Sequence, residues 1–121
     1  MKHLLHLAAL LAVCSLQSAC SFACSLEFHP SVSVKVVDAQ GQPVRDARVT
    51  YTQNGGPEQE AFKDACDPYT GLCEGWYAGL DEPGVFVIKA TSADGTRGVE
   101  QRVTVGGDLC HADTETVQLT L

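Results

Sequence analysis

The stretch from Ser31 to Thr52 constrains the fold most, because it contains two strand-like runs on either side of a turn. Apolar residues alternate with polar ones from Val32 to Val36 and again from Ala47 to Tyr51. This period of two is typical of a strand with one buried face. The intervening segment 38–43 holds aspartate, glycine and proline, which favour turns for separate steric and hydrogen-bonding reasons. The stretch therefore predicts two strands joined by a turn.

The same pattern recurs along the rest of the chain. Further strands are expected at 58–63, 72–80, 85–91, 99–105 and 116–121, separated by segments rich in glycine, proline, aspartate and asparagine. No helical periodicity, repeat or linker interrupts this series. The sequence thus predicts one all-β domain, a seven-stranded Greek-key β-sandwich over residues 24–121. Trp76, the only tryptophan, is expected in its core rather than on a ligand-stacking surface.

Residues 1–23 have the layout of a secretory signal peptide. A basic start at Lys2 precedes an apolar run from Leu4 to Leu16, and small residues follow. An uncleaved anchor helix is the alternative, but polar residues make the run a poor membrane span. We therefore expect an exported protein, in the periplasm, in the outer membrane as a lipoprotein, or outside the cell.

Two cleavage sites fit this leader. Ser21-Phe22-Ala23 has small residues at both ends, which favours cleavage before Cys24 and release of a soluble chain. The segment from Leu16 to Cys20 resembles a bacterial lipobox, in which Cys20 would become a lipidated N-terminus and the only membrane anchor. It departs from that pattern because Gln17 occupies the place that leucine usually takes. Both mature forms remain open.

Of the 6 cysteines, Cys14 and Cys20 belong to the leader. The remaining four predict two disulfides, for which three connectivities exist: Cys24, Cys66, Cys73 and Cys110. The segment between Cys66 and Cys73 contains a proline and a glycine, so it favours a turn that brings these two thiols together. That pairing leaves Cys24 with Cys110. Zinc ligation is disfavoured because the spacing lacks closely spaced ligand pairs.

The acidic balance of the chain limits its partners. The 121 residues carry 8 Lys+Arg against 15 Asp+Glu, and loss of Lys2 with the leader changes the net charge from −7 to −8. Such a charge repels phosphate backbones and anionic membrane surfaces, so nucleic-acid binding is not expected.

One motif in the first strand pair points to a family. It reads V-x-V-x-V-x-D-x-x-G-x-P-V-x-x-A-x-V and is carried by Val32, Val34, Val36, Asp38, Gly41, Pro43, Val44, Ala47 and Val49. It resembles the carboxypeptidase regulatory-like domain, and the resemblance implies a prealbumin-like (transthyretin-like) β-sandwich. The segment Pro83–Ala90 is similar to the second signature of that family. The segment Asp108–His111 is similar to small exported bacterial proteins of this type, in which an N-terminal cysteine accompanies a late Cys-His.

The resemblance covers most of residues 24–121, but its motifs are structural and say little about activity. Hydroxyisourate hydrolases on this fold end in Tyr-Arg-Gly-Ser, whereas this chain ends in Val-Gln-Leu-Thr-Leu at 117–121. That activity is therefore not carried over.

Catalytic motifs are absent from the sequence. It lacks G-x-S-x-G, H-E-x-x-H, a phosphate-binding loop and a dinucleotide fingerprint, so no catalytic residue and no cofactor is expected. Only His29 and His111 remain after the leader, and a Cys24–Cys110 bond would bring both to one end of the sandwich. A two-imidazole metal or proton-transfer site would need a third ligand that no pattern indicates. Two surface histidines are the preferred interpretation.

Acidic residues crowd the middle third of the chain. They are Glu58, Glu60, Asp64, Asp67, Glu74, Asp81 and Glu82. Their spacing does not match a calcium loop. We expect a solvated acidic rim around the Cys66–Cys73 hairpin, which is a candidate docking face for a basic partner.

Three functions are compatible with these patterns. The first is a non-enzymatic accessory domain that binds a protein or a glycan through its surface, at the acidic hairpin or at exposed sheet edges. The second is a hydrolase that uses His29 and His111. The third is a small-ligand carrier formed by dimerisation.

Overall fold

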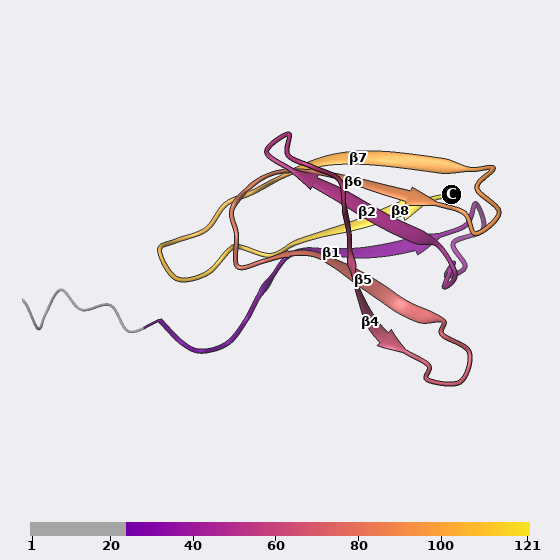
Figure 1. The fold of residues 1–121 in the computed structure, drawn as a ribbon, viewed down its shortest axis with the longest axis horizontal. Coiled ribbons are helices and arrows are strands. Elements are labelled where there is room, and N and C mark those ends of the chain that lie inside the picture. The colour runs from indigo at the N-terminus through magenta and orange to yellow at the C-terminus, as the bar shows by residue number, and fades with distance from the viewer. Residues whose placement is uncertain (1–23) are drawn as a thin grey trace, which may run out of the picture.

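The computed structural model describes residues 24–121, which form eight β-strands and no helix. The strands are β1 (Pro30–Val37), β2 (Arg48–Gln53), β3 (Gln59–Glu60), β4 (Phe62–Cys66), β5 (Cys73–Leu80), β6 (Gly84–Thr91), β7 (Gly98–Val105) and β8 (Glu115–Thr120). They build two four-stranded sheets, in the orders β4-β5-β1-β8 and β3-β2-β6-β7 (Figure 1). Strand β1 pairs with β8 in parallel, and the other pairings are antiparallel. The predicted all-β class is confirmed.

The two sheets share one buried core. The alternating valines of β1 and β8's Val117 and Leu119 belong to the same cluster as Phe86 and Ile88 of β6. Burying a side chain of this size contributes about 1.5–3 kcal/mol to stability. Trp76 of β5 is 2% exposed, so its predicted place in the core is confirmed. Two sheets over one core give the layers of a β-sandwich.

The segment predicted as one strand at 58–63 is divided between the two sheets, and that prediction is wrong. Strand β3 pairs with β2, whereas β4 pairs with β5 of the other sheet. Ala61 lies between them, is buried, and donates its N–H to the carbonyl of Val49 at 3.0 Å. The chain crosses between sheets at this small residue, so eight strands replace the expected seven.

The two disulfides close opposite ends of the molecule. Cys66–Cys73 closes the β4–β5 hairpin, and Cys24–Cys110 joins the segment before β1 to the β7–β8 loop (Figure 1). The predicted pairing is confirmed. Two disulfides are typical of a non-reducing, exported environment. The described part of the chain has no helix of the length and apolarity needed to cross a bilayer. The predicted signal peptide and the lipidation candidate Cys20 lie outside the described residues.

Candidate functional site

The register of β1 and β5 places His29 beside Asp81. Pro30 is paired with Leu80, so the residue before β1 and the residue after β5 are neighbours. The N–H of Asp81 donates to the His29 carbonyl at 2.8 Å, and the N–H of His29 donates to Asp81 Oδ2 at 3.2 Å. Asp81 has a φ of 51°, in the left-handed region that aspartate tolerates better than most residues. The backbone N–H of His29 therefore helps to orient the Asp81 carboxylate.

Two small residues hold the turn that carries Asp81. The Ser31 hydroxyl is buried, donates to the Glu82 carbonyl at 2.8 Å and accepts the Glu82 N–H at 3.0 Å. Gly79 has a φ of 72°, and a Cβ there would lie 2.9 Å from both the Phe86 ring and Ser31 Oγ. Only glycine fits this position without displacing its neighbours. The turn after β5 is thus fixed from two sides.

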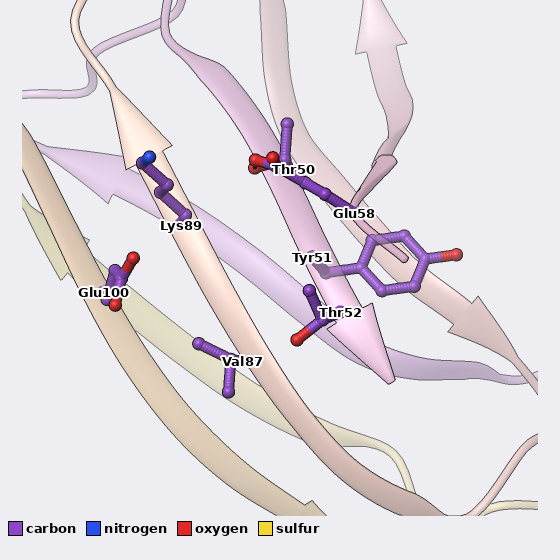
Figure 2. Close-up of a pocket in the computed structure, with 7 residues that line it drawn as sticks. All are labelled: Thr50, Tyr51, Thr52, Glu58, Val87, Lys89 and Glu100. Carbon is purple, nitrogen blue, oxygen red and sulfur yellow. Dashed lines mark hydrogen bonds between the residues drawn. The ribbon is translucent and has the colours of Figure 1, made fainter. Parts of the chain in front are cut away.

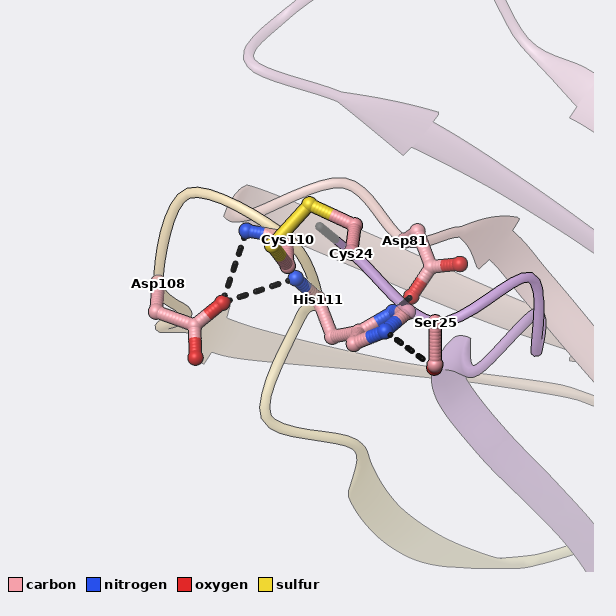
Figure 3. The surroundings of a disulfide bond; sticks show 6 residues. All are labelled: Cys24, Ser25, Asp81, Asp108, Cys110 and His111. Carbon is pink, nitrogen blue, oxygen red and sulfur yellow. Dashed lines mark hydrogen bonds and ion pairs between the residues drawn. A yellow bond between two sulfur atoms is a disulfide. The ribbon is translucent and has the colours of Figure 1, made fainter. Parts of the chain in front are cut away.

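His111 reaches the same end from the β7–β8 loop. The Asp108 carboxylate accepts the N–H groups of Cys110 and His111, both at 2.8 Å (Figure 3). These bonds, that of His111 first, hold the pKa of Asp108 below its ordinary value. The disulfide to Cys24 ties the loop to the start of the described chain. We call residues 24–29, 81–83 and 106–114 the disulfide-tied end.

The side chains of His29, Asp81 and His111 converge at the disulfide-tied end. His111 Nδ1 lies 3.0 Å from Asp81 Oδ1, and the two imidazole rings stack with centroids 4.4 Å apart. The Ser25 hydroxyl lies 2.9 Å from His111 Nε2 (Figure 3). A carboxylate has no proton to give, so a neutral His111 ring in this arrangement donates from Nδ1 to Asp81 and accepts from Ser25 at Nε2. One nitrogen or oxygen from each of the three residues lies within 4.8 Å of the others.

The charge of Asp81 is kept by its hydrogen bonds. Partial burial is the largest single cause and raises the pKa of this carboxyl, but the hydrogen bonds from His111 and from the His29 N–H, together with the electrostatic attraction of both histidines, lower it by more. The net pKa is below the ordinary value, so Asp81 is ionised at neutral pH. A second carboxylate, Glu27 Oε2, lies 3.6 Å from His29 Nε2. The cluster therefore offers two stacked imidazoles with a fixed carboxylate beside them.

A groove of about 540 Å³ opens beside this cluster. It is lined mainly by apolar surface, from Ser25, Leu26, Glu27, Phe28, Asp81, Cys110 and His111. Leu26 is 95% exposed and Phe28 is 80% exposed. Apolar side chains that project together beside a polar cluster are typical of a contact surface.

A second hollow lies on the outer face of β2, β6 and β7 (Figure 2). It measures about 160 Å³, which is below the usual range of small-molecule sites, about 300–1,000 Å³. Two carboxylates, Glu58 and Glu100, line this hollow. The Glu58 carboxylate already accepts a hydrogen bond from Thr50 Oγ1 at 2.6 Å. The Tyr51 ring turns away from the other lining side chains and packs 6.0 Å from Phe86. This hollow is a weaker candidate than the groove.

Only part of the predicted acidic rim lies at the Cys66–Cys73 hairpin, where Asp64, Asp67 and Glu74 are found. Asp81 lies at the far end of β5, eight residues from that hairpin. Other members have internal partners: Glu60 pairs with Arg48, Glu74 with Arg45, and Asp64 accepts the Tyr77 hydroxyl. The hydrogen bond from the Tyr77 hydroxyl to Asp64 is the main reason why the pKa of Tyr77 is raised. These three carboxylates therefore already have partners within the fold.

The expectation that His29 and His111 share one end is confirmed, whereas Asp81 was missed as their partner. The sequence placed Asp81 only in a turn and among the acidic residues. Only the strand pairing could have identified it: Asp81 directly follows β5, His29 directly precedes β1, and these two strands pair with each other. No protein-family model matches this chain, and no curated protein matches it at a significant level.

Proposed function

We propose that this protein is an exported, non-enzymatic binding domain that docks a protein partner at its disulfide-tied end. The observation that carries the proposal is the groove, with Leu26 and Phe28 projecting beside it. Exposed aromatic and aliphatic anchors of this kind supply much of the energy of protein interfaces. A disulfide and the Asp108 hydrogen bonds fix the Cys110–His111 side of the groove, which lowers the entropy cost of docking there.

The chemistry of the groove favours a protein over a glycan. Its apolar lining combines the exposed Phe28 ring with the aliphatic Leu26, whereas Trp76, the only tryptophan of the sequence, is buried in the core. The groove has two carboxylates, Glu27 and Asp81, and no lysine or arginine is found among the residues of 24–121 that line it. The complementary partner is a segment with an apolar anchor flanked by basic residues, and its affinity should fall as salt rises.

A pull-down from the native cell envelope tests this proposal. Phe28→Ser removes the aromatic anchor, and Tyr69→Ser is the matched control because Tyr69 is 96% exposed on the opposite hairpin. We expect the wild type and Tyr69→Ser to recover one protein at low salt, and Phe28→Ser to lose it. Equal recovery by all three chains would contradict docking at this end.

We also propose that residues 1–23 are an export leader on a seven-stranded Greek-key, prealbumin-like body of the carboxypeptidase regulatory-like type. The two disulfides support export. On this proposal, the two-residue strand β3, which pairs with β2 at the edge of its sheet, is an addition to the seven strands. Mass spectrometry of the mature N-terminus distinguishes a soluble chain starting at Cys24 from a chain lipidated at Cys20. An intact Met1 in exported material would exclude both.

A hydrolase is the second candidate, because Ser25, His111 and Asp81 form a hydrogen-bonded line. Such a line can transfer the hydroxyl proton to Nε2 as the oxygen attacks an acyl carbon. However, Ser25 is exposed on an irregular segment. The N–H groups of Cys110 and His111 donate to Asp108, so they are not free to stabilise an oxyanion. Hydrolysis of p-nitrophenyl acetate that Ser25→Ala abolishes would favour this candidate.

The dimeric carrier remains a prediction of the sequence. Light scattering tests it, since a strict monomer would count against a ligand site between subunits.

A further inference from the structure

We infer that His29, Asp81 and His111 form a binding site for one divalent transition-metal cation of the zinc and copper(II) class. The three residues come from three separate segments, and the fold brings a donor atom of each within 4.8 Å of the other two. This inference does not rest on the docking proposal, since a metal titration needs no partner.

The spacing of the donors suits a tetrahedral site. Zinc–nitrogen bonds of about 2.0–2.1 Å place neighbouring donors about 3.3 Å apart. His111 Nδ1 and Asp81 Oδ1 are already 3.0 Å apart. A metal binds in the plane of an imidazole, so the stacked His29 ring must rotate to complete the site. Its side chain is 40% exposed, which leaves room for that rotation.

Ser25 provides the outer partner that a ligating imidazole usually has. A cation that binds His111 Nδ1 takes the place of the proton now shared with Asp81. The imidazole then carries its proton on Nε2 and donates it to Ser25 Oγ, which lies 2.9 Å away. Such outer hydrogen bonds fix the tautomer and the orientation of metal-binding histidines. Ser25 is therefore a positioning residue for the proposed site.

The donor set selects the class of metal. Two imidazoles and one carboxylate suit zinc, copper(II) and nickel, whereas calcium and magnesium require shells made of oxygen. The four described cysteines are all in disulfides, so no thiolate is present among residues 24–121 to favour copper(I). Copper(II) should bind more tightly than zinc, following the general order of divalent metals. Three protein ligands leave a fourth position open to water or to another molecule.

Isothermal titration with zinc chloride tests the inference. The chain is produced through export, purified without a polyhistidine tag, and titrated with its disulfides closed and excess calcium in the buffer. We expect one zinc ion per chain, with binding lost in His29→Ala and His111→Ala. Asp81→Asn keeps an acceptor for the His29 N–H but loses the charge, and it should weaken binding at least tenfold. Ser25→Ala should weaken it about tenfold.

Glu27→Gln is the matched control, because Glu27 is an exposed carboxylate close to His29 that lies outside the cluster. Its zinc affinity should equal that of the wild type. Absence of zinc binding in the wild type, or full affinity in Asp81→Asn, would overturn the site, as would an equal loss in Glu27→Gln.

Proton NMR of the wild type gives a readout that does not depend on a variant folding. The leader holds the other two histidines, so the mature chain has two imidazoles, His29 and His111. Equimolar zinc should shift the ring signals of both together. A shift of only one ring, or of neither, would contradict a shared cation.

Discussion

His111 Nδ1 lies 3.0 Å from Asp81 Oδ1, although 30 residues separate them in the chain. Neither residue belongs to a strand. Their contact depends on the β1–β5 register, which sets Asp81, and on the Cys24–Cys110 bond, which ties down the loop of His111. The geometry of the site is therefore a consequence of the fold at the disulfide-tied end, and it can be tested by disturbing that end selectively.

The Cys24–Cys110 disulfide should matter more than Cys66–Cys73, both for stability and for the site. The first closes a loop with a separation of 86 residues and the second a loop of 7. In the chain-entropy model, their removal costs about 4.5 and about 2.5 kcal/mol, respectively. We expect Cys24→Ser/Cys110→Ser to lower the urea midpoint more than Cys66→Ser/Cys73→Ser does. Only the former should lose zinc affinity, and loss in the latter would place the site elsewhere.

Gly79→Ala should destabilise the protein more than Gly41→Ala. Both glycines have similar positive φ angles, 72° and 78°, so an alanine at either costs about 1–2 kcal/mol of backbone strain. A Cβ at Gly79 also meets the Phe86 ring, whereas none of the surroundings of Gly41 lies within 4 Å. Overpacking adds about 1–3 kcal/mol at Gly79 alone. Equal unfolding free energies for the two variants would contradict the close approach.

Ser31→Ala should loosen the turn that carries Asp81. It removes a buried hydroxyl that bonds both the N–H and the carbonyl of Glu82, at an expected cost of about 1–3 kcal/mol. Ser33→Ala makes the same chemical change two residues along β1 and should stay within about 0.5 kcal/mol of the wild type. Urea unfolding followed by Trp76 fluorescence measures both variants. A larger effect at Ser33 would refute the assigned role.

Asp94→Asn should lower stability at neutral pH but not in strong acid. Hydrogen bonds from the Ser92 hydroxyl first, and then from Thr96, lower the pKa of Asp94 from 3.8 to about 2. A carboxyl with a depressed folded pKa contributes stability above pH 3.8, and this contribution is lost as pH falls through about 2. The difference in unfolding free energy between the two chains should therefore shrink between these values. The exposed Glu115→Gln serves as the control, and a difference that is constant with pH would argue against the bonded carboxylate.

The strands and disulfides were largely predictable because both depend on local signals. Alternation from Val32 to Val36 shows directly which side chains face the core. The turn between Cys66 and Cys73 brings these thiols together, and once they are paired, Cys24 and Cys110 are the two that remain. At Ala61 the local signal fails, because a strand that changes sheets looks in sequence like a continuous one.

The site was only half predictable because it depends on pairing between distant strands. The proximity of His29 and His111 could be predicted from the sequence, because the expected Cys24–Cys110 disulfide joins the two segments that carry them. Asp81 enters through the β1–β5 register, which alternation alone does not specify. Ser25 reaches His111 because of the course of an irregular segment before β1. Neither feature has a signature in a single sequence.

X-ray absorption at the zinc edge, on the exported chain loaded with one equivalent of zinc, identifies the atoms that bind the metal. A site built by His29, Asp81 and His111 should give a first shell with two imidazole nitrogens and a carboxylate oxygen at about 2.0–2.2 Å. A sulfur shell at about 2.3 Å would show that the cysteines bind the metal instead. A shell of oxygens without imidazole scattering would equally contradict a site built by His29, Asp81 and His111.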